Sequence, residues 1–385
     1  MKEGWTYKKL GEVATYHKEQ GNFHDLPYVG MEHIESGSGK LLGTISSNNV
    51  LSSSFKFNKG EVLYGRLRPY LKKVFVAEFD GCCSTEVFPI YSDCIEPGFI
   101  KYWFLSDKIT NMVNQTSAGC RMPRGNMNDV KQFIIGYPAN RQEQQRIVSR
   151  LDSAFAHIDE RKANAEKQLS EARALFQKAL TKAMEPKEGW EEKKIREICL
   201  IKGGKRVPQG YKLETEKTDY PYIRVADFTD EGTISLSDIH YINSSVFQQI
   251  KNYTITDKDI YISIAGTIGK SGIIPSCLNG ANLTENACKL VLNNGINQRY
   301  VYWFTKSDVF KGQISLATRQ TSQPKLALTR LAEVCISLPP LTEQQRIVSR
   351  LDSLSAHVRE LEDVLQKTIA ECDALKQALL RKVFE

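Results

Sequence analysis

The sequence lacks the long apolar runs that mark exported and membrane-spanning chains. Its first residues, MKEGWTYKKLGEV, contain no hydrophobic stretch of signal-peptide length. No later segment approaches the roughly 18 to 20 apolar residues that a membrane helix requires. We therefore expect a cytoplasmic protein that makes no use of a membrane.

Metal-ligand spacing is also missing. The nine cysteines include the adjacent pair Cys82 and Cys83, but no CxxC spacing occurs and no histidine lies at ligand distance in the sequence. Structural zinc sites need such clusters of cysteine and histidine. We expect no metal site, and we expect reduced cysteines that are mostly buried as small apolar residues.

The motifs of the common enzyme classes are absent as well. There is no GxSxG, no HExxH, no glycine-rich dinucleotide fingerprint and no Asn/Asp-Pro-Pro-aromatic motif of an adenine methyltransferase. The stretch IAGTIGKS resembles a phosphate-binding loop, but Ile264 stands where the first glycine belongs. We predict that the chain has no catalytic residues and binds no cofactor of its own.

What the sequence does contain is a duplication. The eleven residues EQQRIVSRLDS stand at 143–153 and again at 343–353, and KEGW at 2–5 returns at 187–190. At 385 residues the chain is long for a single core, so two similar units are expected. The predicted divisions are two variable domains, each followed by a long helix, at residues 1–140, 141–185, 186–340 and 341–385.

Each variable domain has a mixed pattern. Short β-branched or aromatic runs such as EVLYGRLR and DIYISIAG are separated by Gly, Asn, Ser and Pro, which indicates strands joined by turns. One helix is predicted in each domain, at residues 99–114 and 300–315. The expected fold class is α+β, with two similar α/β-mixed domains separated by two long helices.

The long helices carry an apolar seam. Apolar residues recur at alternating steps of four and three, which predicts an antiparallel coiled coil with pseudo-two-fold symmetry. Asn140 and Thr342 are the candidate N-caps, the latter in a capping box with Gln345. In the second copy the seam residues are Ile347, Leu351, Leu354, Val358, Leu361, Leu365, Cys372, Leu375 and Leu379.

About 40 helical residues span roughly 60 Å, so an antiparallel pair is expected to hold the variable domains apart, at opposite ends. The alternative is that these are ordinary bundle helices within one large core.

Basic loops in both domains are the candidate contact residues. The net charge of +7, from 52 Lys and Arg against 45 Asp and Glu, fits a polyanionic partner. Arg and Lys beside Gly, with Gln, Ser and Thr interleaved, are suited to phosphates and to base edges, although a solvated surface loop is the competing interpretation. The predicted DNA-binding residues are Arg66, Arg68, Tyr70, Lys72, Arg121, Arg124, Lys205, Arg206, Thr267, Lys270, Arg319, Gln320, Ser322, Gln323 and Lys325.

The repeated helix opening, the KEGW heads, the RLRPYL and GTIGK turns and the MPRGN and TSQPKL loops together resemble the DNA specificity subunit of type I restriction-modification systems, the S subunit or HsdS family. The resemblance covers essentially the whole chain. It implies two target-recognition domains that each read one half of a split DNA sequence, with the helices as a ruler between them.

The resemblance also implies partners that do the chemistry. Two methyltransferase subunits would use S-adenosylmethionine to modify adenine, and restriction subunits would use ATP and Mg²⁺ to cut. The outer helix faces are expected to dock them through Arg146, Arg150, Gln344, Gln345, Arg346 and Arg350.

Two features depart from the repeated pattern. The first copy lacks the PPL that leads into the second long helix, and the second domain has SIAGTI where the first has GRLRPY. The two domains are therefore expected to read different half-sites. Two other readings stay open: a coiled-coil scaffold with two ligand-binding domains that ignores DNA, and an enzyme in its own right.

Overall fold

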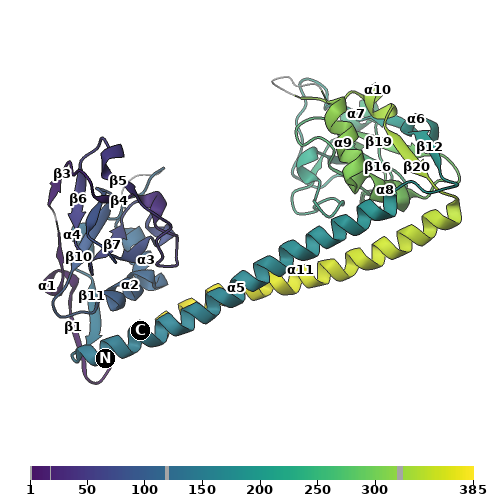
Figure 1. The fold of residues 1–385 in the computed structure, drawn as a ribbon. Coiled ribbons are helices and arrows are strands. Elements are labelled where there is room, and N and C mark those ends of the chain that lie inside the picture. The colour runs from purple at the N-terminus through teal and green to yellow at the C-terminus, as the bar shows by residue number, and fades with distance from the viewer. Residues whose placement is uncertain (1, 18, 118–120, 319–323) are drawn as a thin grey trace. The chain divides into compact units, whose positions relative to one another are not determined.

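The computed structural model describes residues 2–17, 19–117, 121–318 and 324–385. Two compact units make up the chain. Unit 1 holds residues 1–167 and 365–385, and unit 2 holds residues 168–364. Each unit therefore contains one variable domain and a segment from each of two long helices, α5 (Arg141–Met184) and α11 (Leu341–Phe384) (Figure 1).

The variable domain of unit 1 is built on three antiparallel-rich sheets. A four-stranded sheet has the order β2-β10-β7-β8, a five-stranded sheet has the order β3-β6-β9-β4-β5, and β1 pairs with β11 at the junction with α5. The elements are β1 (Trp5–Lys9), α1 (Leu10–Val13), β2 (Thr15–Tyr16), β3 (Gln20–Gly21), β4 (Pro27–Val29), η1 (Met31–His33), β5 (Ile45–Ser46), η2 (Ser47–Asn49), β6 (Ser54–Phe57), β7 (Val62–Gly65), η3 (Pro69–Leu71), β8 (Val74–Val76), β9 (Gly81–Ser84), β10 (Val87–Tyr91), α2 (Pro97–Leu105), α3 (Asp107–Gln115), α4 (Met127–Val130) and β11 (Ile134–Pro138).

Unit 2 repeats this plan. Its four-stranded sheet has the order β13-β19-β16-β17, β12 pairs with β20, and β14 pairs in parallel with β18 as β4 does with β9. The elements are β12 (Glu191–Lys194), α6 (Ile195–Ile198), β13 (Cys199–Gly203), β14 (Pro221–Ile223), η4 (Val225–Asp227), β15 (His240–Tyr241), α7 (Ser244–Ile250), β16 (Ile260–Ser263), β17 (Ser271–Gly272), η5 (Ser276–Leu278), β18 (Asn282–Leu283), β19 (Ala287–Leu292), α8 (Gln298–Lys306), α9 (Asp308–Ala317), α10 (Leu328–Ala332) and β20 (Cys335–Leu338). The predicted α+β class is confirmed in both units.

The prediction of one helix in each domain was wrong. Two helices stand in place of each predicted one, α2 and α3 in unit 1 and α8 and α9 in unit 2, and they meet at Ser106 and at Ser307. The hydroxyl of each serine accepts a hydrogen bond from the backbone N–H three residues further on, so it caps the start of a new helix. Apolar residues continue on both sides of the serine, so their periodicity in the sequence does not reveal that one helix ends and another begins.

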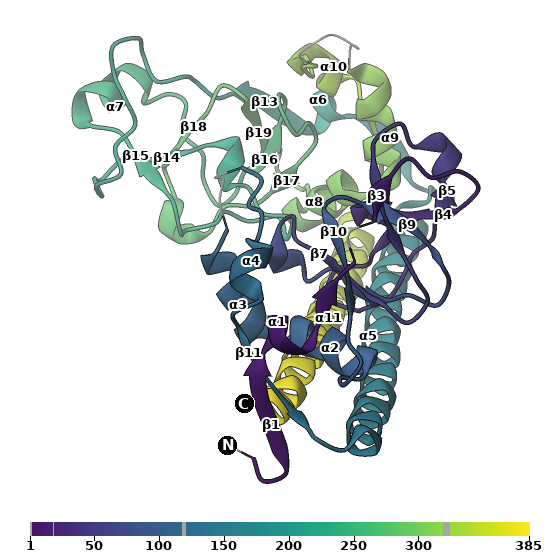
Figure 2. The same cartoon turned by 90° about the vertical axis from the view of Figure 1, so that its left-hand side faces the viewer.

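The α5 and α11 segments of each unit pack side by side (Figure 2). In unit 1, Asp159 pairs with Lys376 and Lys162 pairs with Asp373, so residue numbers rise along one helix as they fall along the other. The predicted antiparallel coiled-coil pairing is therefore confirmed. Each segment also joins the core of its own unit, as Leu180 and Leu351 do in unit 2.

The predicted seam is wrong at two positions. Leu361 is 43% exposed and Leu375 is 50% exposed, while Lys376, one residue later, is only 8% exposed. A strict alternation of four and three assumes 3.5 residues per turn, and a straight helix drifts by about 20° from that pattern in every heptad. The face that packs inward therefore shifts to the partly buried Glu362 and the buried Lys376.

The two predicted helix caps had different outcomes. Asn140 is confirmed, because its side-chain oxygen accepts a hydrogen bond of 2.8 Å from the N–H of Gln142. Thr342 is not a cap, because α11 already begins at Leu341 and the backbone carbonyl of Pro340 accepts from Glu343 and Gln344. Within the described residues, no helix is long and apolar enough to cross a membrane.

Candidate nucleic-acid interface

Backbone hydrogen bonds join two turns of unit 1 at one end of the four-stranded sheet. The segment that follows β7 hydrogen-bonds the segment that precedes α4: the N–H of Arg68 donates to Pro123 at 2.7 Å, and the N–H of Gly125 donates to Arg66 at 2.9 Å. The predicted loops GRLRPY and RMPRGN thus form one surface, although about 55 residues separate them in the chain.

Glu86 organises the arginines of this surface. One carboxylate oxygen accepts from Arg66 Nε at 2.9 Å, and the other accepts from Arg124 Nε at 2.8 Å. Burial by itself would raise the pKa of Glu86, but the two guanidinium groups outweigh it and the pKa is lowered. Arg66 also lies over the ring of Phe88, 5.3 Å from its centroid. Two cations are thereby held in fixed positions by one carboxylate, with net positive charge left over.

Arg68 takes an unusual conformation in the same turn. Its φ is +52°, in the left-handed region that non-glycine residues seldom occupy. Its Nε is buried and has no hydrogen-bond partner among the residues that the structure describes. A strained backbone and an unsatisfied guanidinium donor together mark a residue that is suited to an acceptor from outside the chain.

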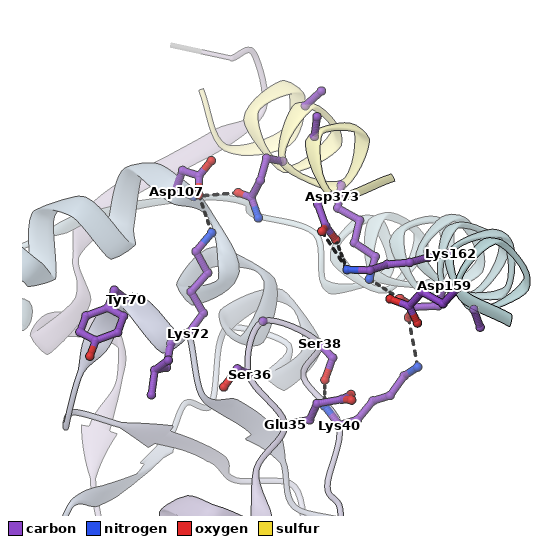
Figure 3. A pocket seen from close by; sticks show the side chains of 18 of the residues that line it. Glu35, Ser36, Ser38, Lys40, Tyr70, Lys72, Asp107, Asp159, Lys162 and Asp373 are labelled. Carbon is purple, nitrogen blue, oxygen red and sulfur yellow. Dashed lines mark hydrogen bonds and ion pairs between the residues drawn. The ribbon is translucent and has the colours of Figure 1, made fainter. Parts of the chain in front are cut away.

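Tyr70 and Lys72 have different surroundings. Tyr70 is 53% exposed, whereas Lys72 Nζ is held at 2.5 Å by Asp107 at the start of α3. Both line a cavity of about 1010 Å³ between the variable domain and the helix segments of unit 1 (Figure 3). Many charges of this cavity are paired with each other, including Lys40 with Asp159 at 3.1 Å. Of the two residues, only Tyr70 is freely available at the surface.

Unit 2 builds the same paired turns with other side chains. Ala265 forms a bridge with Lys325, and the N–H of Leu326 donates to Ile264 at 2.9 Å. By strand register, Arg66, Arg68 and Glu86 of unit 1 correspond to Ile264, Gly266 and Asn286 here. Gly266 keeps the positive φ of Arg68, at +75°. The backbone is conserved between the copies while the chemistry of the surface is replaced.

In unit 2, the cation beside the paired turns is Arg206, which follows the end of a different strand, β13. Arg206, whose side chain is 78% exposed, pairs with Glu285 at 2.6 Å after β13 ends. Burial favours the neutral form of Glu285, but Arg206 and Thr284 outweigh it and lower its pKa. Lys205 precedes this pair and lies 5.7 Å from the centroid of Tyr253.

The remaining predicted DNA-contact residues fall into three groups. Lys270 is paired with Asp230 at 2.9 Å and is therefore partly neutralised. Arg121, Thr267 and Lys325 are exposed. The predicted residues Arg319, Gln320, Ser322 and Gln323 lie outside the described part of the chain.

The repeated helix opening serves first to attach each helix to its own domain. Gln144 is fully buried and accepts from the N–H of Glu96 at 2.7 Å, at the start of α2. Gln344 is 2% exposed and accepts from the N–H of Asn297 at 2.9 Å, at the start of α8. The prediction that Gln344 lies on the outer helix face was therefore wrong. A pattern of polar residues did not reveal this, because a buried amide is satisfied by backbone groups that lie far away in the sequence.

The other predicted partner-contact residues, Arg146, Arg150, Gln345, Arg346 and Arg350, are exposed. Arg146 and Arg346 each form an ion pair with the glutamate three residues before them, at 2.7 and 2.8 Å. Among the described residues, no group of three His, Cys, Asp or Glu side chains is placed to hold a metal ion.

The carboxylates were missed in the sequence. Glu86 and Glu285 were not singled out, although STEVF and TENAC occupy matching places just before the central strands β10 and β19. In each domain, an acidic residue that lies in the sequence between two basic loops would have indicated a partner for their arginines.

Comparisons with known proteins agree with this organisation. The family model described as "Type I restriction modification DNA specificity domain" matches residues 2–170 and 187–371. The EcoDI specificity subunit of Escherichia coli is 31% identical over 184 residues, which cover 46% of this chain and 41% of that subunit. The chain thus spans less than half of that relative's length.

Two further relatives align with the whole chain. The StySPI specificity subunit of Salmonella potsdam is 24% identical, with 100% of this chain and 89% of that subunit covered. A solved chain from work on complex assembly and conformational transition of the type I R-M system has a TM-score of 0.82 at 23% identity, with 100% and 98% covered, and so shares the fold. With both copies matched by the family model, the chain belongs to the type I restriction modification DNA specificity domain family.

Proposed function

We propose that this chain is the specificity subunit of a type I restriction-modification complex and that its two domains read the two halves of a split DNA site. The observation that carries the proposal is the pair of matching turns. They share one backbone arrangement but have different side chains. Arg66, Arg68 and Arg124 stand on one, and Lys325 stands on the other. Two similar scaffolds with different surfaces are what a bipartite site requires.

Affinity and sequence choice come from different contacts in this proposal. Lysine and arginine side chains neutralise phosphates, which releases counterions and makes binding salt-sensitive. A guanidinium that is held at a fixed angle is also suited to bidentate contact with guanine in the major groove. Glu86 fixes Arg66 and Arg124 in this way, so we assign these two arginines to base or phosphate contacts of the first half-site.

The chain supplies recognition and leaves chemistry to its partners. We assign methylation to two methyltransferase subunits that use S-adenosylmethionine, and ATP- and Mg²⁺-dependent cleavage to restriction subunits. Exposed residues of the two long helices, including Arg150 and Arg350, are the proposed docking positions. Because the substrate is DNA, the proposal places the protein in the cytoplasm.

The long helices set the distance between half-sites in this proposal. Four extra residues lengthen a helix by about 6 Å, which corresponds to about two base pairs of B-DNA. Inserting four residues after Lys167 and four after Lys367, at equivalent places of the two copies, preserves the antiparallel register. The expected result is a longer unread spacer with both half-sites unchanged. An unaltered spacer in a folded variant would contradict the ruler function.

The experiment that tests the proposed function is methylome mapping. The chain is co-expressed with the methyltransferase encoded beside it, in a host without adenine methylation, and modified adenines are located by long-read sequencing. The expected result is one split motif with a modified adenine in each half, on opposite strands. The Arg66→Ala and Arg124→Ala variants should relax the first half alone, while Arg161→Ala on the exposed face of α5 serves as the matched control.

The rival interpretations predict other results. A scaffold that ignores DNA gives no modification and no DNA binding by the purified complex. An enzyme in its own right methylates or cuts DNA without partners. Either result would overturn the proposal.

A further inference from the structure

Ion pairs join α5 to α11 at three places among the described contacts. In unit 1, Lys162 Nζ lies 2.8 Å from Asp373, and Lys376 pairs with Asp159. In unit 2, Arg173 Nε lies 2.7 Å from Glu362. Each pair includes at least one side chain that is less than a third exposed, with relative exposures of 28% for Lys162, 10% for Lys376 and 23% for Glu362. These charges are therefore partly shielded from solvent and interact more strongly than free surface pairs.

The internal repeat relates these residues to one another. The two copies are offset by 200 residues, as EQQRIVSRLDS at 143 and 343 shows. Position 162 is therefore equivalent to 362, and position 173 is equivalent to 373. The first copy carries Lys and Arg at these two positions, and the second copy carries Glu and Asp. The same two positions thus have opposite charge in the two copies.

The buried apolar residues of the two helices are partly the same in both copies, although Ala165 and Ala172 of the first copy are Leu365 and Cys372 in the second. Leu151 and Leu351 are identical and both are buried, and Leu180 and Leu380 are identical and both are fully buried. Apolar burial is nondirectional and depends on area, so it would favour a pair of like helices nearly as much as a pair of unlike helices. At these shared positions, the choice between the pairings is left to the charges beside them.

If two first copies, or two second copies, paired in the same antiparallel register, side chains of the same charge would face each other. Two first copies from separate chains would set Lys162 against Arg173 twice. Two second copies would set Glu362 against Asp373 twice, and would also set Arg359 against Lys376. Only the pairing of a first copy with a second copy satisfies all three ion pairs.

We propose that Lys162, Arg173, Glu362 and Asp373, supported by Lys376, select the pairing of unlike halves and exclude pairing between like halves of separate chains. The partner that each helix fits is the opposite copy of the repeat. Register and partner choice in coiled coils are set in this way by charges that flank the seam. The consequence is that one assembled molecule always carries two different DNA-facing surfaces, one from each copy. The inference depends on the helix contacts alone and stands whether or not the proposed DNA site is correct.

The test divides the complete chain at the exposed linker 185–189 and produces both parts in one cell. The first part is made in two forms with different affinity tags, together with an untagged second part. Purification on one tag followed by native mass spectrometry then counts unlike pairs and like pairs. In the natural sequence we expect the second part to be recovered and the other tag to be absent.

The decisive variant is K162E combined with D373K. It keeps opposite charges at every contact between unlike halves, but it also creates opposite charges at the contacts between like halves. We expect the ratio of like to unlike pairs to rise by roughly tenfold or more, since two juxtapositions change from repulsive to attractive. The pair R173E with E362R is an independent variant with the same expected outcome, should the first fail to fold.

All four substitutions together provide the control. K162E, R173E, E362R and D373K restore like charges between like halves, so exclusive unlike pairing should return. The proposal is overturned if the natural halves form like pairs freely, if the natural halves fail to associate, or if both double variants remain as exclusive as the natural sequence.

Discussion

The two copies of the repeat agree where the helix meets the domain and disagree at the paired turns. Gln144 and Gln344 make the same buried connections to α2 and α8. At the paired turns, by contrast, Arg66 and Glu86 are replaced by Ile264 and Asn286. The difference teaches that one backbone plan is kept for assembly while its surface is free to change what it recognises.

The largest expected effect is on the shared part. Gln344→Ala leaves the N–H of Asn297 and the carbonyl of Pro339 without their buried partner, and Gln144→Ala does the same to the N–H of Glu96. We expect each change to cost about 3 kcal/mol of unfolding free energy. Urea denaturation measures it. Gln145→Ala and Gln345→Ala, at the exposed neighbours, should stay within about 0.5 kcal/mol. A large loss in only one copy would break the comparison.

A smaller effect on stability is expected at the C-terminal end of α8, where the two copies differ. Lys306 stands where unit 1 has the buried Leu105. Burial lowers the pKa of Lys306 to about 8, although Asp230 opposes the shift. Because the folded pKa lies below the unfolded value, the unfolded chain binds more protons between about pH 8 and 10.5, and stability rises with pH across that window.

Lys306→Leu should therefore remove this dependence and stabilise the protein by about 2 kcal/mol at pH 7, since one pKa unit corresponds to about 1.4 kcal/mol. Thermal unfolding at pH 7 and pH 10 measures the difference. Lys212→Leu, at an exposed lysine of the same unit that does not act on Lys306, is the control. No gain at pH 7 would show that Lys306 is charged at no cost.

The carboxylate of unit 1 gives the next effect. The lowered pKa of Glu86 adds stability that is present above its unfolded pKa, near 4.5, and is lost as the pH falls through the folded value. Glu86→Gln should cost about 1 kcal/mol at pH 7, and the cost should decrease as the pH falls below about 4.5. It should also free Arg66 and Arg124 for phosphates, so DNA affinity should become more salt-dependent. Asn286→Asp tests whether unit 2 accepts the same carboxylate.

The smallest effect concerns a single cation of unit 2. Arg206→Ala removes one exposed guanidinium beside Glu285. If Arg206 contacts one phosphate, the slope of log affinity against log salt should fall by about 0.9, which is roughly a threefold to fourfold change between 50 and 200 mM salt. Fluorescence anisotropy with the methylated motif as probe measures the slope. A change in the preferred bases would instead assign Arg206 to base reading.

The repeat was visible in the sequence because assembly constrains the same residues twice. The duplication predicted two units of one topology, and the apolar periodicity predicted two long antiparallel helices. The turn side chains, by contrast, offered no repeat to follow. The loops with Arg66 and Arg124 were each identified as basic, but nothing in their spacing showed that both arginines share Glu86.

The sequence by itself therefore determined the family, the duplicated plan and the helix lengths, because periodicity and identical segments are local properties of the chain. Only the tertiary structure decided which side of the helix opening is buried, where the seam drifts onto Lys376, and which carboxylate holds each arginine. These depend on contacts between residues far apart in the sequence. The burial of an amide, or the partner of a charge, is fixed by the neighbours that folding brings to it.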